Sequence, residues 1–363
     1  MLAGFCAGCA EPAAPHVQRA PATPNARPWP AADRLFRSDP RWLGGDAAVS
    51  IPLDEQRMLW LFGDSFVARE PGQTRSEARL VHNSVALQHG RDPARAEIAF
   101  YAGAAPDGQA AAFFPAPGGG WFWPGHGIVL DGALTVFLER MRPDSAPGGL
   151  GFRSAGWTAL RARDVMSDPR EWQFEPLPVP DTGALGLVGV AVLLEGDFVY
   201  AYAVREPGDH AIMLLRWPRA AFTRGDLRQP QYFLGPGRGF GAGPPAVVMD
   251  EGATEFSVSR TPAGSYVEVQ SRGFGAVPIA VRFARSPSGP FSPLRDVYRP
   301  DEAALHGVLL YAARAHPELE DGQGDLILTY ASNTLEPQRV LGDLRLYVPR
   351  FVRLAMGERR LNP

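Results

Sequence analysis

Residues 57–66 read Arg-Met-Leu-Trp-Leu-Phe-Gly-Asp-Ser-Phe, and the rest of the chain is organised around this stretch. Apolar side chains fill every position from 58 to 62, so the stretch predicts a strand that is buried on both faces. It ends in Gly63-Asp64-Ser65, which places a carboxylate at the mouth of a buried strand. A buried carboxylate without partners is costly. Asp64 therefore either caps the turn through its side chain or faces a cation, several donors or a reaction.

A second strand is predicted just upstream, over residues 42–53, with a turn at residues 54–56. Two strands joined so closely pair as an antiparallel hairpin. In that hairpin Asp46, near the start of the first strand, lies beside Asp64 at the end of the second. Two carboxylates on one rim are harder to explain as turn chemistry than either one alone.

Composition and charge narrow the class of protein. The chain has 363 residues, enough for one large domain or two small ones, and its 45% hydrophobic content is ordinary for a globular protein. Its net charge of −3, without a basic stripe, argues against nucleic acid as a partner. All 36 basic residues are Arg. This reflects either a GC-rich genome or a use for guanidinium groups that bind hydroxyls and anions. No stretch is long and apolar enough to span a membrane.

The N-terminal segment is unlike the rest of the chain. The only cysteines are Cys6 and Cys9, so neither a disulfide framework nor a Cys-based metal site is expected in the folded part. Residues 1–9 look like the truncated end of a bacterial lipoprotein signal, in which Cys9 carries lipid; a CxxC redox or metal motif is the alternative. Residues 10–32 are rich in Pro and Ala and predict a disordered tether. We expect an extracytoplasmic monomer, either a lipoprotein or a secreted protein, that touches the membrane only through Cys9.

Residues 33–358 repeat one pattern of short strands broken by Gly, Pro and Asp, without an amphipathic helix of any length. The period is roughly 55–70 residues, and each unit holds three or four strands. Five such units begin near residues 45, 121, 189, 255 and 307. They predict an all-β fold, a five-bladed β-propeller closed in part by residues near the N-terminus. A pair of β-sandwiches is the competing fold.

The repeat also predicts where the functional groups lie. In each blade of a propeller, the start of strand one, the end of strand two and the start of strand three share one face. These positions are polar in this chain, whereas the opposite ends are mostly Asp-Gly and Glu-Gly turns. Besides Asp46, Asp64, His82, Glu206, Glu255 and Ser332, this rim holds the expected substrate-binding residues, which are Asn83, His126, Glu139, Arg140, Arg205, Gln270, Arg272, His306, Tyr330 and Asn333.

The first unit carries a family resemblance. Its segments Gly-Gly-Asp-Ala-Ala-Val-Ser (44–50) and Trp-Leu-Phe-Gly-Asp-Ser (60–65) resemble those of a bacterial five-bladed propeller family long catalogued as a domain of unknown function. The characterised members of that family are endo-D-arabinanases, and its fold is similar to that of the arabinanase and xylosidase propellers. The resemblance continues at residues 82–84, 123–127, 286–291 and 311–318, and it spans residues 41–356. It implies a glycoside hydrolase that acts on a furanoside-containing polysaccharide, with D-arabinan favoured.

The resemblance also implies roles for three acids. In the related arabinanase propellers, an acid at the start of the first inner strand is the base, a Glu that opens the fourth blade is the acid, and an Asp in the third blade tunes it. Asp46 and Glu255 match the first two positions. Residues 189–191 carry no carboxylate, and Asp64 is the substitute. Glycoside hydrolysis needs one protonated and one ionised carboxyl group. The expected roles are thus Glu255 as acid, Asp46 as base or nucleophile, and Asp64 as the residue that holds or tunes them.

Other interpretations stay open. Glu255 could simply pair with a nearby Arg, and His306 could be a buried histidine that is hydrogen-bonded within the protein. Without the third-blade acid, a non-catalytic carbohydrate-binding propeller at the cell surface is the main alternative; a protein-interaction scaffold has no need of paired acids. In either case the expected partner is a polysaccharide or oligosaccharide. The chemistry requires no cofactor and no catalytic metal. Related propellers can place a cation near the position of His306, so a structural cation such as calcium in the central channel is compatible with the resemblance.

Overall fold

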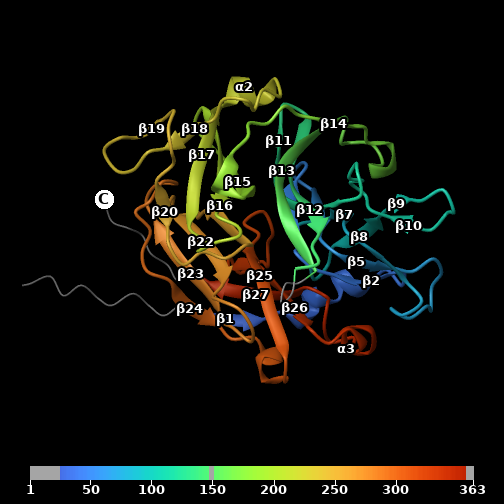
Figure 1. The fold of residues 1–363 in the computed structure, drawn as a ribbon. Helices are drawn as coiled ribbons and strands as arrows, with labels where there is room; N and C mark the ends of the chain where they lie inside the picture. The colour runs from blue at the N-terminus through green and yellow to red at the C-terminus, as the bar shows by residue number, and fades with distance from the viewer. Residues whose placement is uncertain (1–24, 147–150, 357–363) are drawn as a thin grey trace, which may run out of the picture.

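A computed structural model describes residues 25–146 and 151–356, and this part of the chain is built almost entirely from β-strands (Figure 1). Its α-helices are α1 (Pro30–Asp33), α2 (Arg219–Thr223) and α3 (Pro337–Gly342), each of six residues or fewer. The expected all-β class, without long helices, is confirmed. No helix in the described ranges is long and apolar enough to cross a bilayer.

Five antiparallel sheets of four or more strands follow one another along the chain. The first contains β3 (Val49–Pro52), β4 (Arg57–Phe62), β7 (Ser84–His89) and β8 (Glu97–Tyr101). The second contains β11 (Trp121–Leu130), β12 (Ala133–Pro143), β13 (Phe152–Arg163) and β14 (Phe174–Pro176). The third contains β15 (Leu187–Glu195), β16 (Phe198–Val204), β17 (Ile212–Pro218), β18 (Gln231–Phe233) and β19 (Phe240–Gly241), with β20 (Val247–Met249) paired to β17.

The last two sheets differ in how they are completed. The fourth contains β21 (Phe256–Arg260), β22 (Tyr266–Ser271), β23 (Ile279–Ala284) and β24 (Arg295–Tyr298). The fifth contains β25 (Val308–Ala315), β26 (Leu326–Thr334), β27 (Arg350–Ala355) and, from the other end of the chain, β1 (Asn25–Pro28). Outside these sheets lie a three-stranded sheet of β2 (Trp42–Gly45), β5 (Ser65–Val67) and β6 (Arg79–Val81), and a hairpin of β9 (Gly103–Ala104) and β10 (Ala110–Ala111).

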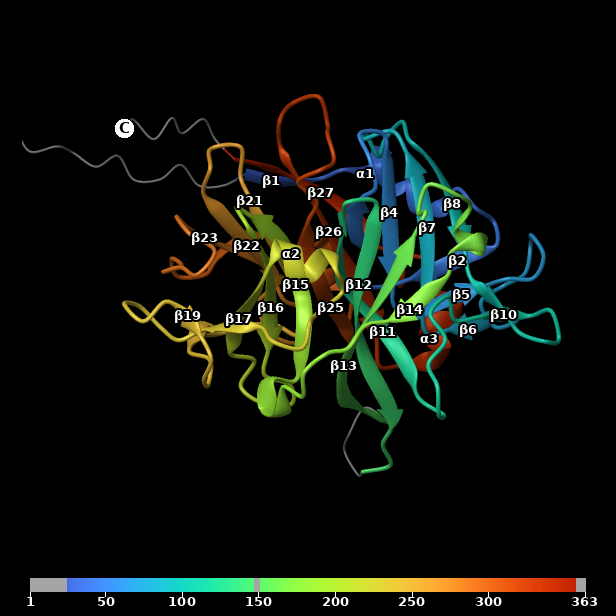
Figure 2. The same ribbon diagram turned by 90° about the horizontal axis from the view of Figure 1, so that it is seen from above.

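The first strand of each sheet packs beside the first strand of the next. β11 contacts both β3 and β15, β15 contacts β21, and β21 contacts β25. Figure 1 shows the sheets following one another around the molecule in chain order, from blue to red. In the view from above, β1 and α1 lie on the opposite side of the molecule from the connected ends of β12 and β13 (Figure 2). The apolar core lies between neighbouring sheets.

β4 confirms the strand that was predicted to be buried on both faces. Leu59 and Leu61 pack with residues of the second sheet such as Leu134, whereas Trp60 packs with residues of the fifth sheet such as Phe351. Residues 58–62 have no measurable exposure. The two apolar faces of one strand thus join the first sheet to its neighbours on either side, and this keeps the end of β4 in a fixed place.

The expected single strand over residues 42–53 is wrong, because the chain breaks at Asp46. β2 pairs with β5 in the side sheet, and β3 pairs with β4 in the first sheet. Ala47 adopts a positive φ of 54° at the break, a region that few residues other than Gly occupy. The chain passes between the same two sheets again at residues 63–64, which separate β4 in the first sheet from β5 in the side sheet. Asp46 and Asp64 therefore stand at one corner, where the amide of Gly63 donates to the carbonyl of Asp46 at 3.0 Å.

The N-terminal boundary also differs from the expected one. The sequence places residues 25–32 in the tether, whereas in the structure they form β1 and most of α1. β1 pairs with β27, and the amide of Trp29 donates to the carbonyl of Phe351 at 2.8 Å. Trp29 and Ala32 are buried. The sequence predicts that residues near the N-terminus help to close a propeller, and in the structure they form the fourth strand of the last sheet. The signal-like segment with Cys6 and Cys9 lies outside the described residues.

Candidate active site

Five carboxyl groups from the first four sheets gather at one end of the strands. Asp46 precedes β3 and Asp64 follows β4, Glu139 lies in β12, Glu206 follows β16, and Glu255 precedes β21. The negative charges of Asp64 and Glu255 raise the pKa of Asp46, and those of Glu255 and Glu206 raise the pKa of Glu139. These five acids are called the carboxyl cluster below. The structure thus brings the three expected catalytic acids together, with Glu139 and Glu206 beside them.

Asp46 is the most strongly perturbed acid of the cluster. Burial is the largest influence and raises its pKa well above the ordinary value, followed by the charges of Asp64 and Glu255. Two phenols act in the opposite direction: Tyr311 donates to Oδ2 at 2.7 Å, and a hydrogen bond from Tyr347 also favours the charged form. Burial outweighs these donors, so Asp46 tends to carry a proton. This runs against the ionised base that the resemblance implies for it.

Asp64 lies in a different environment. One of its oxygens, Oδ1, accepts hydrogen bonds from Nδ1 of His82 at 3.0 Å and from the indole of Trp123 at 2.8 Å. The ring of His82 stacks on Trp121 with centroids 4.5 Å apart. The side chain of Asp64 is 21% exposed. The carboxyl group is therefore oriented by two N–H donors and remains open to solvent, next to a wall of aromatic rings.

Glu255 and Glu139 also have raised pKa values. Burial raises the pKa of Glu255, and the guanidinium of Arg314 acts against this rise. Burial raises the pKa of Glu139 to about 8, helped by the charges of Glu255 and Glu206. Glu139 lies where the register of β12 with β13 shifts, between Glu139 and Met141. Such bulges re-aim side chains. Because of its raised pKa, Glu139 is mostly protonated at neutral pH.

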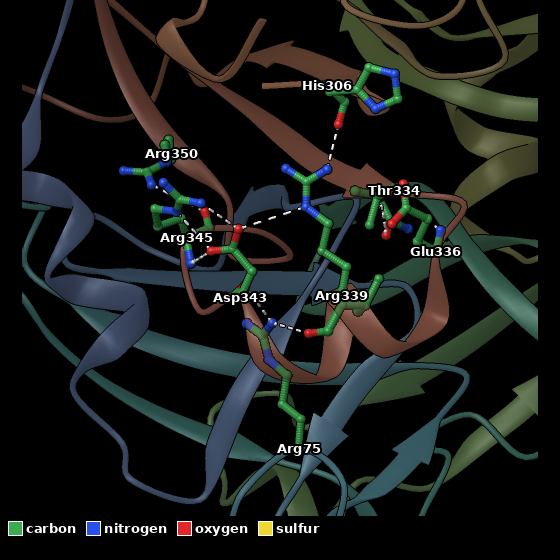
Figure 3. Close-up of polar contacts among 10 residues, drawn as sticks. Arg75, His306, Thr334, Glu336, Arg339, Asp343, Arg345 and Arg350 are labelled. Atoms are coloured by element: carbon green, nitrogen blue, oxygen red, sulfur yellow. Dashed lines mark hydrogen bonds and ion pairs between the residues drawn. The ribbon is translucent and has the colours of Figure 1, made fainter. Parts of the chain in front are cut away.

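Arg75 joins the segment before Tyr347 to the segment before Asp46. Figure 3 shows its side chain pointing toward the segment that carries Arg339 and Asp343. Its buried guanidinium donates to the carbonyl of Leu43 at 2.8 Å, and to three carbonyls of the segment around α3, those of Val340 (2.8 Å), Asp343 (3.3 Å) and Leu346 (2.8 Å). Asp343 is itself held by Arg345 at 2.7 Å, whose hydrogen bonds lower its pKa to about 2.

The close fit of these two segments also explains Gly44. A Cβ atom at Gly44 would lie 2.2 Å from the carbonyl oxygen of Tyr347, so no other residue fits without a shift. Tyr347 has a positive φ of 63°, and its amide donates to the carbonyl of Ser332 at 2.8 Å. The phenol of Tyr347 is thus positioned from three sides, by Arg75, by Gly44 and by β26.

Three expected substrate-binding residues are engaged inside the protein. The amide of Asn83 donates to the carbonyl of Phe122 at 2.9 Å. Tyr330 donates to Glu302 at 2.7 Å, and Gln270 donates to the carbonyl of Glu251 at 2.8 Å. All three are buried. Asn83 precedes β7 and Gln270 lies near the end of β22, whereas Tyr330 lies within β26. The side chains of all three bind other parts of the protein.

The remaining expected residues differ in their exposure and in their hydrogen-bond and ion-pair partners. Arg205 pairs with Asp209 at 2.7 Å, and Arg272 pairs with Asp296 at 3.2 Å and Glu251 at 3.6 Å. Arg140 is exposed, and the carbonyl of His306 accepts a hydrogen bond from Arg339. Asn333 donates to the phenol oxygen of Tyr311 at 3.4 Å. Among these residues, Asn333 is therefore joined to Asp46 through Tyr311.

His126 and Arg314 lie deeper, between the first strands of the sheets. Nδ1 of His126 accepts from the amide of Val192 at 2.9 Å, and Nε2 lies 3.3 Å from the carbonyl of Ser50. Burial, with the charge of Arg314, lowers the pKa of His126 to about 4. Arg314 donates to the carbonyls of Val190 at 2.8 Å and Phe256 at 2.6 Å. Both ring nitrogens of His126 thus lie against backbone groups.

This interior is a poor fit for a structural calcium ion. Calcium takes oxygen ligands, yet a buried guanidinium, that of Arg314, already binds the inward-facing carbonyls here. Within the described ranges, no group of three or more His, Cys, Asp or Glu side chains is arranged to hold a metal ion. Arg314 therefore supplies the positive charge that a cation would bring.

Sequence reasoning missed the roles of Tyr311, Tyr347, Arg314 and Arg75. Tyr311 and Arg314 flank a register shift in the β25–β26 pairing, with Ala312 at a positive φ of 54°. This bulge in the first strand of the fifth sheet turns the phenol toward Asp46. The only local signal is the polar residues within an otherwise apolar strand. Arg75 lies in a loop of ordinary polar composition, and no signal in the sequence marks it.

The comparisons with known proteins concern mainly the fold. A family model described as "Domain of unknown function (DUF5005)" matches residues 31–356. No curated protein matches the chain. A solved structure described as a "putative hydrolase from Bacteroides ovatus ATCC 8483" has a TM-score of 0.71 at 16% identity, covering 91% of this chain and 90% of the other. This likeness shows a shared fold.

Two other solved structures are more distant. An α-L-arabinofuranosidase from Podospora anserina, in complex with cellotriose, has a TM-score of 0.48 at 10% identity, covering 87% of this chain and 92% of the other. An exo-1,5-α-L-arabinanase from a bovine ruminal metagenomic library has a TM-score of 0.46 at 11% identity, covering 87% of this chain and 94% of the other. At TM-scores below 0.5, neither likeness assigns a property to this chain.

Proposed function

Because the chain belongs to the family described as "Domain of unknown function (DUF5005)", whose name assigns no activity, we propose its function from the site itself: it is a glycoside hydrolase that works at the carboxyl cluster. One observation carries this proposal. Asp46, which burial keeps protonated, and Asp64, which two N–H donors orient, stand at one corner of the chain. Hydrolysis of a glycosidic bond needs two carboxyl groups at one site, one that donates a proton and one that acts as base or nucleophile.

We assign the roles from the two environments. Asp46 is the general acid that protonates the leaving oxygen, because burial and the neighbouring charges favour its neutral form. Asp64 is the base or nucleophile, because two N–H donors, those of His82 and Trp123, hold one of its oxygens in place. Glu255 raises the pKa of Asp46 through its charge. This assignment moves the acid role from Glu255, where the resemblance puts it, to Asp46.

The architecture proposed with this function is a five-bladed propeller. Its support is the sequence of five sheets whose first strands contact one another in order. The fifth sheet reaches the first through Tyr311, which binds Asp46, and through His316, which lies 2.6 Å from the hydroxyl of Ser50. In a propeller such contacts complete the circle, and the catalytic groups meet at one end of the central channel.

The proposed substrate is a furanoside-containing polysaccharide, with D-arabinan favoured by the resemblance of the first unit. The aromatic side chains beside the carboxyl cluster suit a neutral sugar. Trp123 packs edge-to-face on Phe152 with centroids 4.7 Å apart, and Trp121 lies 6.1 Å from Trp123. Such aromatic faces pack well against the C–H faces of sugar rings. Trp123 also binds Asp64 directly, so a sugar on this wall lies next to the base.

The test is incubation of the purified protein with a panel of D-arabinans, L-arabinans, galactans and xylans, followed by chromatography of the products. Release of oligosaccharides from one furanoside polymer, abolished in Asp64→Asn, is the expected result. A protein that releases nothing from any polymer of the panel contradicts the proposal.

A carbohydrate-binding propeller without turnover is the second candidate. The observation that favours it is the third sheet, whose first strand β15 carries no carboxylate at residues 189–191. Retained polysaccharide binding without any product is the result that selects it. The extracytoplasmic location, the lipid on Cys9 and the monomeric state accompany both candidates as predictions from the sequence.

A further inference from the structure

A second concave site lies beside the third sheet. It is a pocket of about 380 Å³, and the residues that line it include Asp181, Thr182, Arg205, Tyr232 and Pro244. None of the five acids of the carboxyl cluster lines it. Its volume lies at the lower end of the range of about 300–1,000 Å³ that is usual for small-molecule sites.

The pocket opens on the same face as the carboxyl cluster. Arg205 follows the end of β16, and the next residue, Glu206, belongs to the cluster and acts on Glu139 through its charge. Asp181 and Thr182 lie just before β15, as Glu255 lies just before β21. All these residues thus stand at the same ends of their strands.

The polar groups of the pocket can still bind a ligand. Arg205 donates from Nη1 to Asp209 at 2.7 Å, its side chain is 40% exposed, and its guanidinium has further N–H donors. The hydroxyl of Thr182 accepts from the indole of Trp157 at 2.8 Å, so its own hydrogen is free to be donated. Asp181 accepts from the amide of Gly183 at 2.9 Å and retains lone pairs for a second donor.

The apolar groups suit a ring with C–H faces. Tyr232 lies in β18 and its phenol is partly buried, which raises its pKa. Pro244 adds a rigid apolar ring, and buried Met213 lies below. Asp181 supplies an acceptor and Arg205 supplies donors, and a neutral polyhydroxyl ligand uses both kinds of group.

We propose that this pocket is a second sugar-binding site, which holds a neutral sugar ring of the same polysaccharide chain away from the bond that is cleaved. The identity of the polysaccharide rests on the proposed function; the binding of a neutral sugar rests on the pocket alone. Arg205 and Asp181 grip ring hydroxyls, Thr182 donates to one more, and Tyr232 packs on the ring. The site makes the protein favour long chains over short fragments.

The experiment measures binding apart from turnover. In an Asp64→Asn background, isothermal titration calorimetry compares long and short oligosaccharides of arabinan, galactan and xylan. Tyr232→Ala and Arg205→Ala are each expected to weaken binding of the long oligosaccharides of one series by about tenfold, and to narrow the difference between long and short ones. Tyr232→Phe keeps the ring and is expected to retain most of the affinity.

Arg228→Ala is the control, because Arg228 is a more exposed Arg that likewise pairs with a nearby acid, Asp226, at 2.9 Å, and it lies outside the pocket. Thermal melting checks that all variants are folded. Long oligosaccharides that bind the Tyr232→Ala and Arg205→Ala variants as tightly as the control, or that bind none of the proteins, overturn the second site. If binding depends on Tyr232 but the wild-type protein hydrolyses no polymer, the sugar-binding site is supported. The proposed hydrolase activity is then contradicted.

Discussion

The hydroxyl of Tyr311 donates a hydrogen bond of 2.7 Å to Oδ2 of Asp46, and this contact joins two residues that are 265 positions apart in the chain. The phenol holds one oxygen of the carboxyl group in place. The other oxygen, Oδ1, lies against the backbone of Gly63, the residue before Asp64. Oδ1 of Asp46 thereby faces the corner at which Asp64 stands.

The first prediction concerns the two acids at this corner. Asp46→Asn and Asp64→Asn are each expected to lower the rate of hydrolysis by about 10²–10⁴-fold, the usual contribution of a positioned acid or base. Product release from the active polymer is the measurement, and circular dichroism checks the fold. Asp226→Asn, at an exposed ion pair far from the cluster in the fold, is the control. Full activity in either variant removes the mechanism.

Gly63 is expected to be as necessary as the acids. A Cβ atom at this position would lie 2.4 Å from Oδ1 of Asp46, so Gly63→Ala displaces the carboxyl group without altering its chemistry. We expect a loss of at least about 10²-fold in rate, since a small misplacement of a catalytic group has that effect. Gly342→Ala is the matched control, because an added Cβ there meets nothing within 4 Å. Equal activities of the two variants contradict the close packing at Asp46.

The two phenols predict a change in pH dependence. Hydrogen bonds from Tyr311 and Tyr347 favour the charged form of Asp46, so their loss raises its pKa further. If Asp46 is the general acid, activity falls as pH rises through its pKa. Tyr311→Phe and Tyr347→Phe should therefore move the alkaline limb of the kcat/KM profile to higher pH. A shift toward lower pH in both variants contradicts the role of Asp46 as the acid.

Arg75 is expected to act through Tyr347. Arg75→Met leaves four backbone carbonyls near α3 and β2 without their donor, and burying unpaired polar groups costs about 1–3 kcal/mol each before relaxation. The unfolding free energy should fall by several kcal/mol, and the pH profile should shift as in Tyr347→Phe. Arg79→Met, which alters a more exposed Arg in β6 nearby, is the control for urea unfolding. A destabilised variant with an unshifted profile restricts Arg75 to a structural role.

A buried polar chain makes stability depend on pH. The hydroxyl of Ser50 contacts Glu318 and lies 2.6 Å from Nδ1 of His316, whose Nε2 lies 2.7 Å from Thr329. Burial raises the pKa of Glu318 to about 7. A carboxyl group whose pKa is raised by folding contributes stability that is complete below its unfolded value and lost as pH rises to the folded value. That window runs here from about 4.5 to about 7.

Glu318→Gln keeps a neutral partner for Ser50 and removes this titration. The wild type is expected to lose roughly 1–3 kcal/mol of stability more than the variant between pH 5 and pH 8. Urea unfolding at both values measures the difference. Glu320→Gln, two residues away and exposed, is the control. Parallel pH dependence in the wild type and in Glu318→Gln shows that Glu318 titrates normally.

The sequence by itself determined the buried strand at residues 58–62 and the corner at its end. The apolar positions 58–62 already require a strand with two buried faces, and the structure uses one face against the second sheet and the other against the fifth. Asp46 and Asp64 were placed side by side because a short turn forces the flanking strands to pair. The polar rim followed from the period of the repeat. All these inferences depend on local geometry and on residues close together in the chain.

Tertiary structure alone decided which groups complete the site and what charge they carry. Tyr311 reaches Asp46 from 265 residues away, and Arg75 reaches Val340 across the same separation. No local pattern encodes such meetings, because they depend on how whole sheets and loops pack. The protonation of Asp46 depends on desolvation by everything that surrounds it, together with the charges of Asp64 and Glu255. The sequence identifies the acid, but only its surroundings in the folded protein set its pKa.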